Sequence, residues 1–418
     1  MRRLPRFHID RSVFAWALYD WANSAFATVV MAGFFPLFFK QYWSNASDST
    51  VSTFQLGLGN AAASLFIVLV APLLGAIADR GGRRKRFLFA FAAFGIVATG
   101  ALSTVGEGEW AAALGLFVAA TIGFMGANVF YDALLTTVAE AAEWDLVSAF
   151  GFALGYLGGG LLFAVNVAMT LSPASFGLSD AAEAVRLSFL GVALWWALFS
   201  LPLLRWVHEA PPAAPLRGLV LLRAGYAQLL DTFHHVRRLR PVFLFLLAYW
   251  LYIDGVDTVV RMAVDYGMSL GMETKHLISA LLITQFVGFP AALVFGRIGR
   301  RWGPRNGIFI ALGVYVAVTV GAYFMRSSSD FYLLAVAVGL VQGGIQALSR
   351  SFYARLIPPG QSAEFFGFYN MLGKFAALLG PLLVSGVGLA SGDPRLGMLS
   401  LLLLFLGGGW LLTRVKPA

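Results

Sequence analysis

The sequence lacks cysteine altogether and contains little charge. Without cysteine the chain has neither a disulfide nor a thiolate ligand for a metal ion. Only 12% of its 418 residues are charged, whereas 59% are hydrophobic, and five scattered histidines predict no metal site. A soluble domain of this length needs a larger charged surface. The composition therefore predicts a membrane protein with many transmembrane spans.

Motifs for catalysis and nucleotide binding are also missing. The chain has no GxxxxGK[ST] phosphate loop, so ATP-driven work is not supported. The glycine clusters at 106–109 and 158–160 are not dinucleotide fingerprints, because no soluble strand-turn-helix surrounds them. No combination of Ser, His and an acid lies at one depth. We therefore expect no enzyme, no cofactor and no metal ion.

Long apolar runs fill the chain, and about 20 apolar residues suffice for one transmembrane helix. Twelve runs are long enough, so the expected fold class is an all-α membrane protein with twelve transmembrane helices. The runs cover residues 12–40, 54–78, 87–105, 110–137, 147–171, 185–204, 241–266, 276–296, 307–325, 331–355, 364–390 and 395–413.

Lys and Arg gather on one side of these spans. They concentrate before the first span, after the second, between the sixth and seventh, after the eighth and at the chain's end. By the positive-inside rule, both termini are expected in the cytoplasm. The net charge of +9 is thus a topology signal, and we expect no nucleic-acid partner.

Two halves follow from the pattern of spans. The longest polar stretch separates six spans from six, which predicts an N-terminal half (1–205), a cytoplasmic linker (206–240) and a C-terminal half (241–418). Residues 75–84 and 296–305 both carry Gly, Arg, Gly and Arg at their first, sixth, eighth and tenth positions. Phe-Tyr at 130–131 recurs at 352–353, and Phe-Gly-Phe at 150–152 recurs at 366–368. The consistent order predicts two six-helix pseudo-repeats, an arrangement found in transporters.

These features resemble the major facilitator superfamily over essentially the whole chain. The loop motif that carries the resemblance consists of Gly75, Asp79, Arg80, Gly82, Arg83 and Arg84. Within the superfamily, YDWANS at 19–24, LYIDG at 251–255, GIQALSRS at 344–351 and EFFGFY at 364–369 resemble the UMF1 group, bacterial relatives of the vacuolar amino-acid effluxer Atg22. The resemblance implies a rocker-switch transporter. The compact chain resembles the bacterial members, so we expect the bacterial inner membrane as its location and a monomer as its working form. The resemblance also implies that helices 1, 4, 7 and 10 line a central cavity.

Three charged residues lie at similar depths in spans one, four and ten. Asp20, with the amide Asn23 nearby, lies roughly 12 Å inside span one at 1.5 Å per residue, and Asp132 and Arg350 lie similarly far from the cytoplasmic ends of theirs. A charge at membrane depth costs roughly 2.5–3.5 kcal/mol. We therefore expect both carboxylates to face the arginine, as a cytoplasmic gate or a charged substrate site. A static ion pair, or an arginine that snorkels to the surface, remains the alternative.

Span seven holds a second group of charges. Arg261 is four residues from both Asp257 and Asp265, which allows a local i,i+4 ladder. Asp254 lies outside this ladder near mid-membrane, where a lone carboxylate is a candidate proton carrier. Lys374 lies near the middle of span eleven and needs a partner, for which Asp254 and Asp257 are the candidates.

Other polar positions have two open interpretations each. Gln346, deep in span ten, is a candidate substrate contact or an interhelical hydrogen bond. Asp79 is expected to face the start of span eleven near Ser362 and to hold the cytoplasmic side shut, with a solvated loop as the alternative.

Two further predictions concern packing. Gly151, Gly155 and Gly159 recur every fourth residue and predict a flat face on span five for close contact with another helix. Trp43, at the end of span one, is expected to anchor the membrane interface.

The combined prediction is a secondary active transporter for a small polar or zwitterionic solute, with amino acids first and protons as the candidate coupling ion. Asp20 or Asp254 would take an amine, and Arg350 or Lys374 a carboxylate. Membrane lipids are the expected surroundings. A drug or toxic-metabolite exporter on the same fold remains open, as does a lipid scramblase or non-transporting membrane scaffold.

Overall fold

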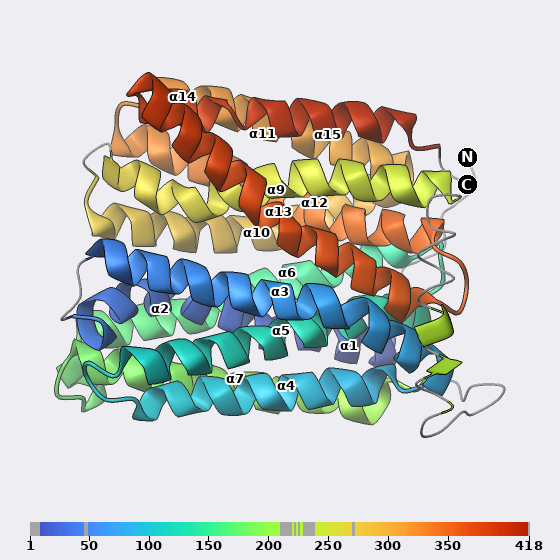
Figure 1. The fold of residues 1–418 in the computed structure, drawn as a ribbon, viewed down its shortest axis with the longest axis horizontal. Coiled ribbons are helices and arrows are strands. Elements are labelled where there is room, and N and C mark those ends of the chain that lie inside the picture. The colour runs from blue at the N-terminus through green and yellow to red at the C-terminus, as the bar shows by residue number, and fades with distance from the viewer. Residues whose placement is uncertain are drawn as a thin grey trace.

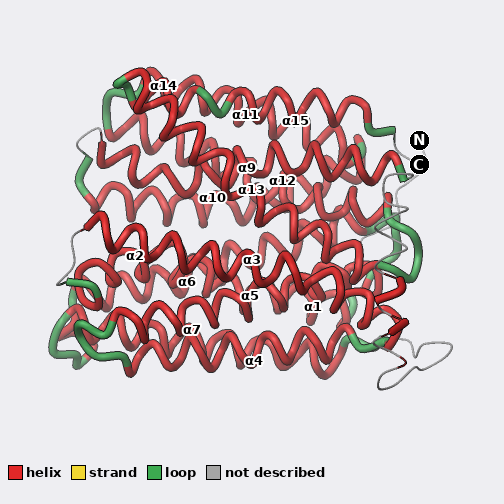
Figure 2. The backbone as a smooth tube through the Cα atoms, in the orientation of Figure 1, coloured by secondary structure: helices red, strands yellow, loops and turns green. Residues whose placement is uncertain are grey.

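The computed structural model describes residues 9–45, 49–209, 220, 223–224, 226–228, 239–269 and 272–416. Within the helices, the side chains of residues 49–50, 53, 264–265, 268–269, 274 and 374–378 lie outside this description. Every regular element of the described part is a helix and none is a strand (Figure 2). The predicted all-α fold is confirmed. Most of the predicted linker, 206–240, falls outside the described residues.

The described residues form twelve crossings, and Figure 1 shows how they are arranged in a bundle. The first six are α1 (Arg11–Ala25) continued by η1 (Phe26–Phe34), α2 (Phe35–Phe38) and η2 (Phe39–Trp43), then α3 (Ser49–Gly81), α4 (Arg84–Ala101) with η3 (Leu102–Thr104), α5 (Trp110–Val138), α6 (Trp144–Leu171) and α7 (Ala181–Trp206). The last six are α9 (Arg240–Ser269), α10 (Thr274–Trp302), α11 (Pro304–Phe324), α12 (Ser328–Leu356), α13 (Ser362–Ser391), and α14 (Pro394–Leu399) with α15 (Leu402–Arg414).

Eleven of the crossings are long and apolar enough to span a membrane by length and composition. The twelfth is α13, which holds undescribed side chains and whose described apolar part is Leu379–Ser391. The predicted twelve-helix architecture therefore agrees with the structure. Because an even number of crossings returns the chain to its starting side, α1 begins and α15 ends at the same end of the bundle (Figure 1). We call this the terminal end.

The two six-helix halves meet along two seams. On one seam, α6 of the first half packs against α10 and α12 of the second. On the other, α3 and α5 pack against α13. The repeat relates α3 to α10, α5 to α12 and α6 to α13. Each seam is therefore built from equivalent helices, with the roles of the two halves reversed. Any group placed on one of these helices can therefore reach the opposite half.

Close packing of α6 on α1 depends on glycine. A Cβ atom at Gly155 would lie 2.5 Å from Ser24 Oγ, and one at Gly159 would lie 2.7 Å from Thr28 Oγ1. At Gly151 it would lie 2.9 Å from the ring of Trp16. The predicted flat face on span five is confirmed. It brings the polar side chains of the first crossing close to the axis of α6.

Turns at the terminal end repeat between the halves. Gly82 follows α3 with φ of 58°, and Gly303 follows α10 with φ of 85°. L side chains rarely adopt such positive φ values, and glycine does so without strain. The two glycines hold the same position in the repeated motif, so the repeat found in the sequence is also a repeat of backbone conformation. Arg83 directly precedes α4, and its N–H donates to Ala78 O at 3.1 Å.

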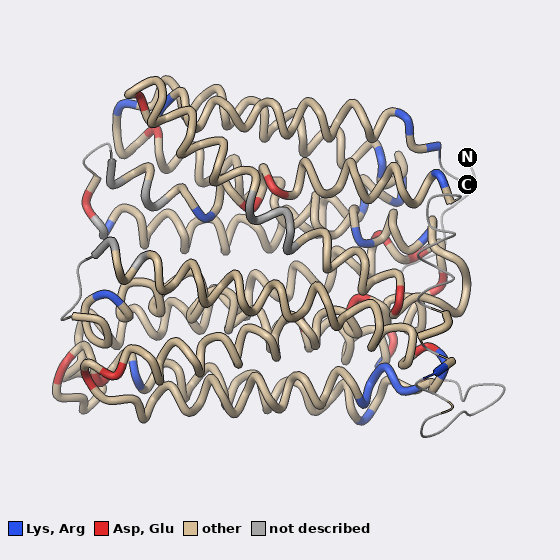
Figure 3. The backbone as a smooth tube through the Cα atoms, in the orientation of Figure 1, with Lys and Arg blue, Asp and Glu red and all other residues tan. Residues whose placement is uncertain are grey.

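Positively charged side chains are not spread evenly over the bundle. Lys and Arg gather mainly at its terminal end (Figure 3).

The prediction that Trp43 anchors the membrane interface is wrong. Its side chain is fully buried, contacts Phe35 and Phe189, and donates from Nε1 to Val105 O. The loop before α5 covers it, which the position at a span end did not reveal.

Candidate functional site: a cavity between the halves

A cavity of about 360 Å³ lies between the halves. Its wall comes from α1, η1, α5, α6, α9, α10, α12 and α13. The implied lining by spans one, four, seven and ten agrees with this wall, and spans five, eight and eleven add to it. Its polar side chains are Asp20, Asn23, Ser24, Thr28, Asn128, Tyr131, Asp132, Tyr156, Tyr249, Asp257, Thr284, Gln285, Gln342, Gln346, Arg350, Tyr369 and Asn370.

The first crossing widens where it meets the cavity. Its backbone changes from α-helical to π-helical at η1, and Ala27, Thr28 and Ala32 of η1 lie on the cavity wall. π-Helical turns are rare and often occur at functional sites. The local geometry of η1 thus agrees with its place beside the cavity.

Arg350 of α12 ties the second half to the first. Its Nη1 donates to Asp132 Oδ1 at 3.1 Å, and its Nη2 lies 3.8 Å from Asp20 Oδ2. Its Nε donates to Ser148 Oγ and its Nη2 to Ser148 O, each at 2.9 Å. Only 2% of the Arg350 side chain is exposed, and two carboxylates compensate a charge that would be costly to bury alone. The structure thus brings together Asp20, Asp132 and Arg350.

Aromatic rings complete the surroundings of this arginine. The guanidinium carbon lies 4.4 Å from the ring centroid of Phe152, 4.8 Å from that of Trp16 and 5.3 Å from that of Tyr131. Such contacts add cation–π attraction. Trp16 Nε1 donates to Tyr131 O at 2.9 Å, and the Tyr131 hydroxyl donates to Asp20 Oδ2 at 3.1 Å. Asp20 is therefore held from two sides.

A second helix of the C-terminal half also binds Asp132. Asn370 of α13 donates from Nδ2 to Asp132 Oδ2 at 3.0 Å. Asp132, on α5, therefore contacts both α12 and α13. Any separation of the halves at this level must break these contacts.

A second ion pair joins the halves nearer the terminal end. Arg355 of α12 donates from Nη1 to Asp145 Oδ1 at 2.9 Å and from Nη2 to Asp145 Oδ2 at 3.0 Å. Ser351 also donates to Asp145 Oδ1. Sequence reasoning missed Asp145, because an acidic residue in the first turn of a helix is ordinary there. Arg355 is equally ordinary, because positively charged residues are common at the cytoplasmic ends of spans.

Asp79 makes the contact predicted for it at the start of span eleven. Its Oδ1 accepts from Ala363 N at 3.1 Å and its Oδ2 from Glu364 N at 2.9 Å. The first N–H groups of a helix have no partner inside the helix and favour a negative charge. Arg84 Nη2 lies 2.7 Å from Asp79 Oδ1 on the other side. The carboxylate thus joins the end of α3 to the start of α13.

Other members of the loop motif lie at the same junction. The backbone of Gly75 packs so closely on Ala363 that a side chain there would overlap the Ala363 carbonyl. Arg80 Nε donates to Gln228 Oε1, and Gln228 Nε2 donates to Glu364 Oε2. One residue of the predicted linker therefore bridges the two halves.

Amide side chains occupy the cavity wall farther from this junction. Asn23 Nδ2 donates to Asn128 Oδ1 at 2.6 Å within the first half. Gln285 Nε2 donates to Thr28 Oγ1 at 3.0 Å, which joins α10 to η1 across the halves. Several amide groups thus face the same cavity as the carboxylates.

Asp257 and Gln346 line the cavity as well. Asp257 Oδ2 lies 4.0 Å from Arg261 Nη2, so the predicted ladder is present there only as a long contact. The Asp257 side chain is 26% exposed. Gln346 Oε1 accepts a long bond of 3.5 Å from the Tyr156 hydroxyl. These two polar groups are held less tightly than the Arg350 cluster.

Asp254 does not line the cavity. Its side chain is fully buried between α9 and α13, where Oδ1 accepts from Gly380 N at 3.0 Å and from Thr258 Oγ1 at 3.4 Å. Lys374, for which Asp254 is a candidate partner, lies outside the described side chains, and so does Asp265, the second carboxylate of the predicted Arg261 ladder. Among the described residues, no group of three or more His, Cys, Asp or Glu could hold a metal ion.

Comparisons with known proteins agree with this architecture. The family described as "Vacuole effluxer Atg22 like" matches residues 50–145 and 136–417. The MFS-type transporter YxiO of Bacillus subtilis is 39% identical over 94% of this chain and 92% of its own length. Autophagy-related protein 22 of Yarrowia lipolytica is 29% identical over 57% of this chain and 44% of its own.

A solved structure shows the same fold. The human organic anion transporter MFSD10 superposes with a TM-score of 0.72 at 17% identity, covering 96% of this chain and 99% of its own. Together, the family match, the bacterial relative and the shared fold show that the chain is a multi-pass membrane transporter and not an enzyme. It belongs to the Atg22-like family of the major facilitator superfamily.

Proposed function

We propose that the chain is a secondary active transporter that moves a small polar or zwitterionic solute, amino acids first, by alternating access. The observation that carries this proposal is the cavity between the halves, whose wall holds carboxylates and amides from both. A solute bound there contacts both halves, so its binding energy depends on their relative position. Differential binding of this kind is what a rocker-switch transporter needs.

The terminal end is the proposed cytoplasmic gate. Asp79 joins α3 to α13, Asp145 joins α6 to α12, and Arg350 joins α12 to α5. All three contacts cross between the halves. Opening this end must break them, and solute binding from the other side would favour their formation.

The amine of a zwitterion is proposed to bind Asp257 rather than Asp20. Asp20 and Asp132 are already engaged by Arg350 and Tyr131, whereas Asp257 lines the cavity with only a 4.0 Å contact to Arg261. The cavity amides are the proposed partners of a carboxylate. Arg350 has three donated bonds in place and acts as part of the gate.

Proton coupling through Asp254 is a second part of the proposal. Its carboxylate is buried on α9, one turn from Asp257 and beside α13. A carboxylate enclosed in protein at membrane depth is a functional candidate.

The protein is proposed to work as a monomer in the bacterial inner membrane. Both termini are proposed to lie in the cytoplasm, because Lys and Arg gather at the terminal end.

Transport assays test the proposal directly. Purified protein in proteoliposomes is expected to exchange a labelled amino acid for the same unlabelled solute held inside. Exchange of amphipathic cations without amino acids would support the drug exporter instead. Movement of lipid between leaflets without turnover of any solute would contradict transport and favour a scramblase.

A further inference from the structure

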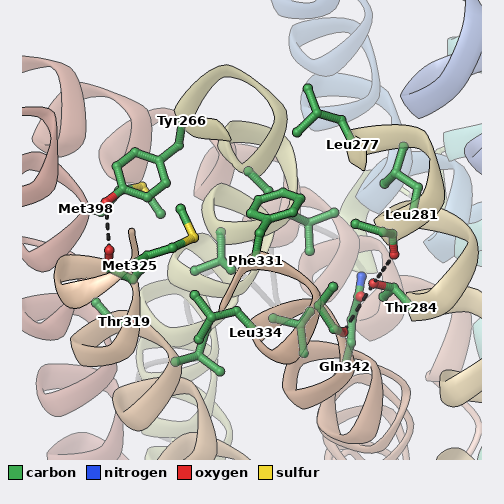
Figure 4. A pocket seen from close by; sticks show the side chains of 18 residues that line it. Tyr266, Leu277, Leu281, Thr284, Thr319, Met325, Phe331, Leu334, Gln342 and Met398 are labelled. Carbon is green, nitrogen blue, oxygen red and sulfur yellow. Dashed lines mark hydrogen bonds between the residues drawn. The ribbon is translucent and has the colours of Figure 1, made fainter. Parts of the chain in front are cut away.

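A second, apolar pocket opens beside the cavity in the C-terminal half (Figure 4). It has a volume of about 80 Å³ and lies among α9, α10, α11, α12 and α14. We call it the side pocket. Four residues line both spaces: Val260, Leu281, Thr284 and Gln342. The side pocket is therefore continuous with the wall of the cavity where the solute is proposed to bind.

The hydroxyl groups around the side pocket are already hydrogen-bonded to backbone carbonyls. The Tyr266 hydroxyl donates to Ala322 O at 2.7 Å, and the Thr284 hydroxyl donates to Ala280 O at 2.9 Å (Figure 4). Thr319 Oγ1 donates to Tyr315 O at 2.8 Å in the same way. What these residues present to the pocket is ring and methyl surface.

The remaining wall is aliphatic and aromatic, and the residues that complete it include Val259, Leu277, Met325, Phe331, Leu334 and Val338. Cavities lined in this way stay dry and take up apolar groups. The side pocket is smaller than the cavity of ~150 Å³ that holds benzene. It fits a short alkyl group and is too small for a large aromatic ring.

One polar atom at the border remains open. Among the described residues, none donates a hydrogen bond to Gln342 Oε1, which is buried. A buried acceptor without a donor costs about 1–3 kcal/mol, so it favours a ligand that supplies one. Asp257 lies one helical turn from Val260 on α9 and lines the cavity as well. Gln342 lines both spaces and Asp257 lines the cavity, so a positively charged donor group in the cavity has an acceptor and a carboxylate available to it.

We propose that the side pocket selects the solute: the transported molecule carries an ammonium group, which Gln342 and Asp257 receive, and a short alkyl group, which fills the side pocket. This inference rests on the proposed transport function and names the substrate class for the same cavity. Small residues in the wall of the side pocket, such as Ala335, leave the space that limits the size of this alkyl group.

Two homologous ligand series test this inference on the full-length protein in nanodiscs. One series is zwitterionic, from glycine to 2-aminohexanoate, and the other consists of n-alkylamines of the same chain lengths. Dissociation constants come from calorimetric titration. Affinity is expected to rise about fourfold with each added methylene, as for transfer out of water. The rise should stop once the alkyl group exceeds the pocket.

Variants distinguish the pocket from general hydrophobic binding. Ala335→Leu fills the side pocket and is expected to remove the gain with chain length, while the shortest ligands bind as before. Ala337→Leu makes the same change on α12 at a residue that lines neither space, and it should leave the gain intact. Gln342→Leu is expected to weaken all members of both series about tenfold, the factor that corresponds to a lost hydrogen bond of ~1.4 kcal/mol.

The outcomes separate this inference from the transport proposal. If zwitterions bind and exchange with an affinity that is independent of chain length and of Ala335→Leu, the side pocket has no such role while the transport proposal stands. If only the alkylamines bind, with the expected sensitivity to Ala335→Leu, the side pocket is supported and zwitterion transport is refuted. Absence of any chain-length dependence in both series overturns the inference.

Discussion

Arg350 shows how one residue can serve as a connection rather than as a binding group. Its guanidinium is buried, donates to Asp132 and Ser148, and rests on three aromatic rings. Removing one partner of such a buried pair leaves an uncompensated charge, which typically costs 3–5 kcal/mol. A substrate carboxylate would have to displace these contacts to reach the arginine. At the residue scale, the arginine therefore fits a gate better than a substrate site.

Charge exchange tests the gate. Asp20→Arg is expected to abolish solute exchange in proteoliposomes, because it places two positive charges next to each other in a buried site. Adding Arg350→Asp should restore part of the exchange by recreating an opposite pair at the same place. Thermal unfolding of each variant serves as the control for folding. Full activity of Asp20→Ala would contradict the gate.

The coupling role of Asp254 has its own test. Asp254→Asn keeps the oxygen that accepts from Gly380 N but removes the group that takes up a proton. The variant should therefore fold and bind solute, while solute-dependent proton flux, followed with a pH-sensitive dye inside the liposomes, is lost or uncoupled. Asp330→Asn, at an exposed helix start, is the control and should leave the flux unchanged. Normal coupled flux in Asp254→Asn would remove Asp254 as the carrier.

At the scale of helices, the two seams are related but not identical. Gly75 of α3 lies against the start of α13, and Gly296 of α10 lies against the start of α6, where a Cβ atom would approach Ala149 Cβ to 2.6 Å. The repeated glycine thus performs the same task twice. It lets the end of one helix approach the start of a helix from the other half.

The carboxylate that connects the two halves lies on a different helix in each seam. In the first seam the acid is Asp79, on the helix that ends there, and it binds the start of α13. In the second seam Arg300 stands at the corresponding position, and the acid is Asp145 within the first turn of α6. Asp145 pairs with Arg355 of α12 instead of with backbone N–H groups. The two connections therefore differ in the helices that they hold.

Gly75→Ala tests the first seam. The new Cβ would lie 2.8 Å from Glu364 Cα and overlap the Ala363 carbonyl, so α13 must move away from α3. Overpacking of this kind typically costs 1–3 kcal/mol, and it should weaken the bonds from α13 to Asp79. We expect the free energy of unfolding to fall and the rate of solute exchange to differ from that of the unchanged protein. Gly57→Ala on the same helix meets no atom within 4 Å and is the matched control; an equal effect of both variants would contradict this explanation.

At the scale of the whole molecule, all three charged connections lie toward the terminal end. Asp79 and Asp145 lie at the ends of their helices and Arg350 lies deeper. In this conformation, three contacts between the halves thus hold the terminal end together. Release of one connection should shift the population toward a state open at that end.

The absence of cysteine allows this shift to be measured. Ala347 is fully buried at the seam between α12 and α6, where its carbonyl accepts from Ser148. Ala347→Cys should react slowly with a water-soluble maleimide in the otherwise unchanged chain and several times faster when combined with Asp79→Asn. Ser179→Cys, on an exposed loop, should react at the same rate in both backgrounds. Equal protection of Ala347→Cys in both would show that Asp79 does not hold the terminal end closed.

Much about this protein follows from the order of its residues. The twelve apolar runs and the repeated loop motif predict the helices and their pairing into halves, because a helix in lipid must satisfy its own backbone hydrogen bonds. The cost of charge at membrane depth identifies Asp20, Asp132 and Arg350 as a group, and the loop motif leads to Asp79. These predictions depend on spacing along one helix or on depth across the membrane. Both quantities can be read from a sequence.

Which side chains of different helices meet, and which of them face the cavity, depends on tertiary structure alone. Asp145 and Arg355 are ordinary residues at helix ends until the packing of α6 on α12 brings them together. Asp254 and Asp257 are three residues apart on α9, yet Asp257 lines the cavity and Asp254 does not. The side pocket exists only because α9, α10, α11, α12 and α14 leave space between them. Depth along the membrane is set by position in the chain, whereas the direction in which a side chain points depends on which neighbours its helix packs against.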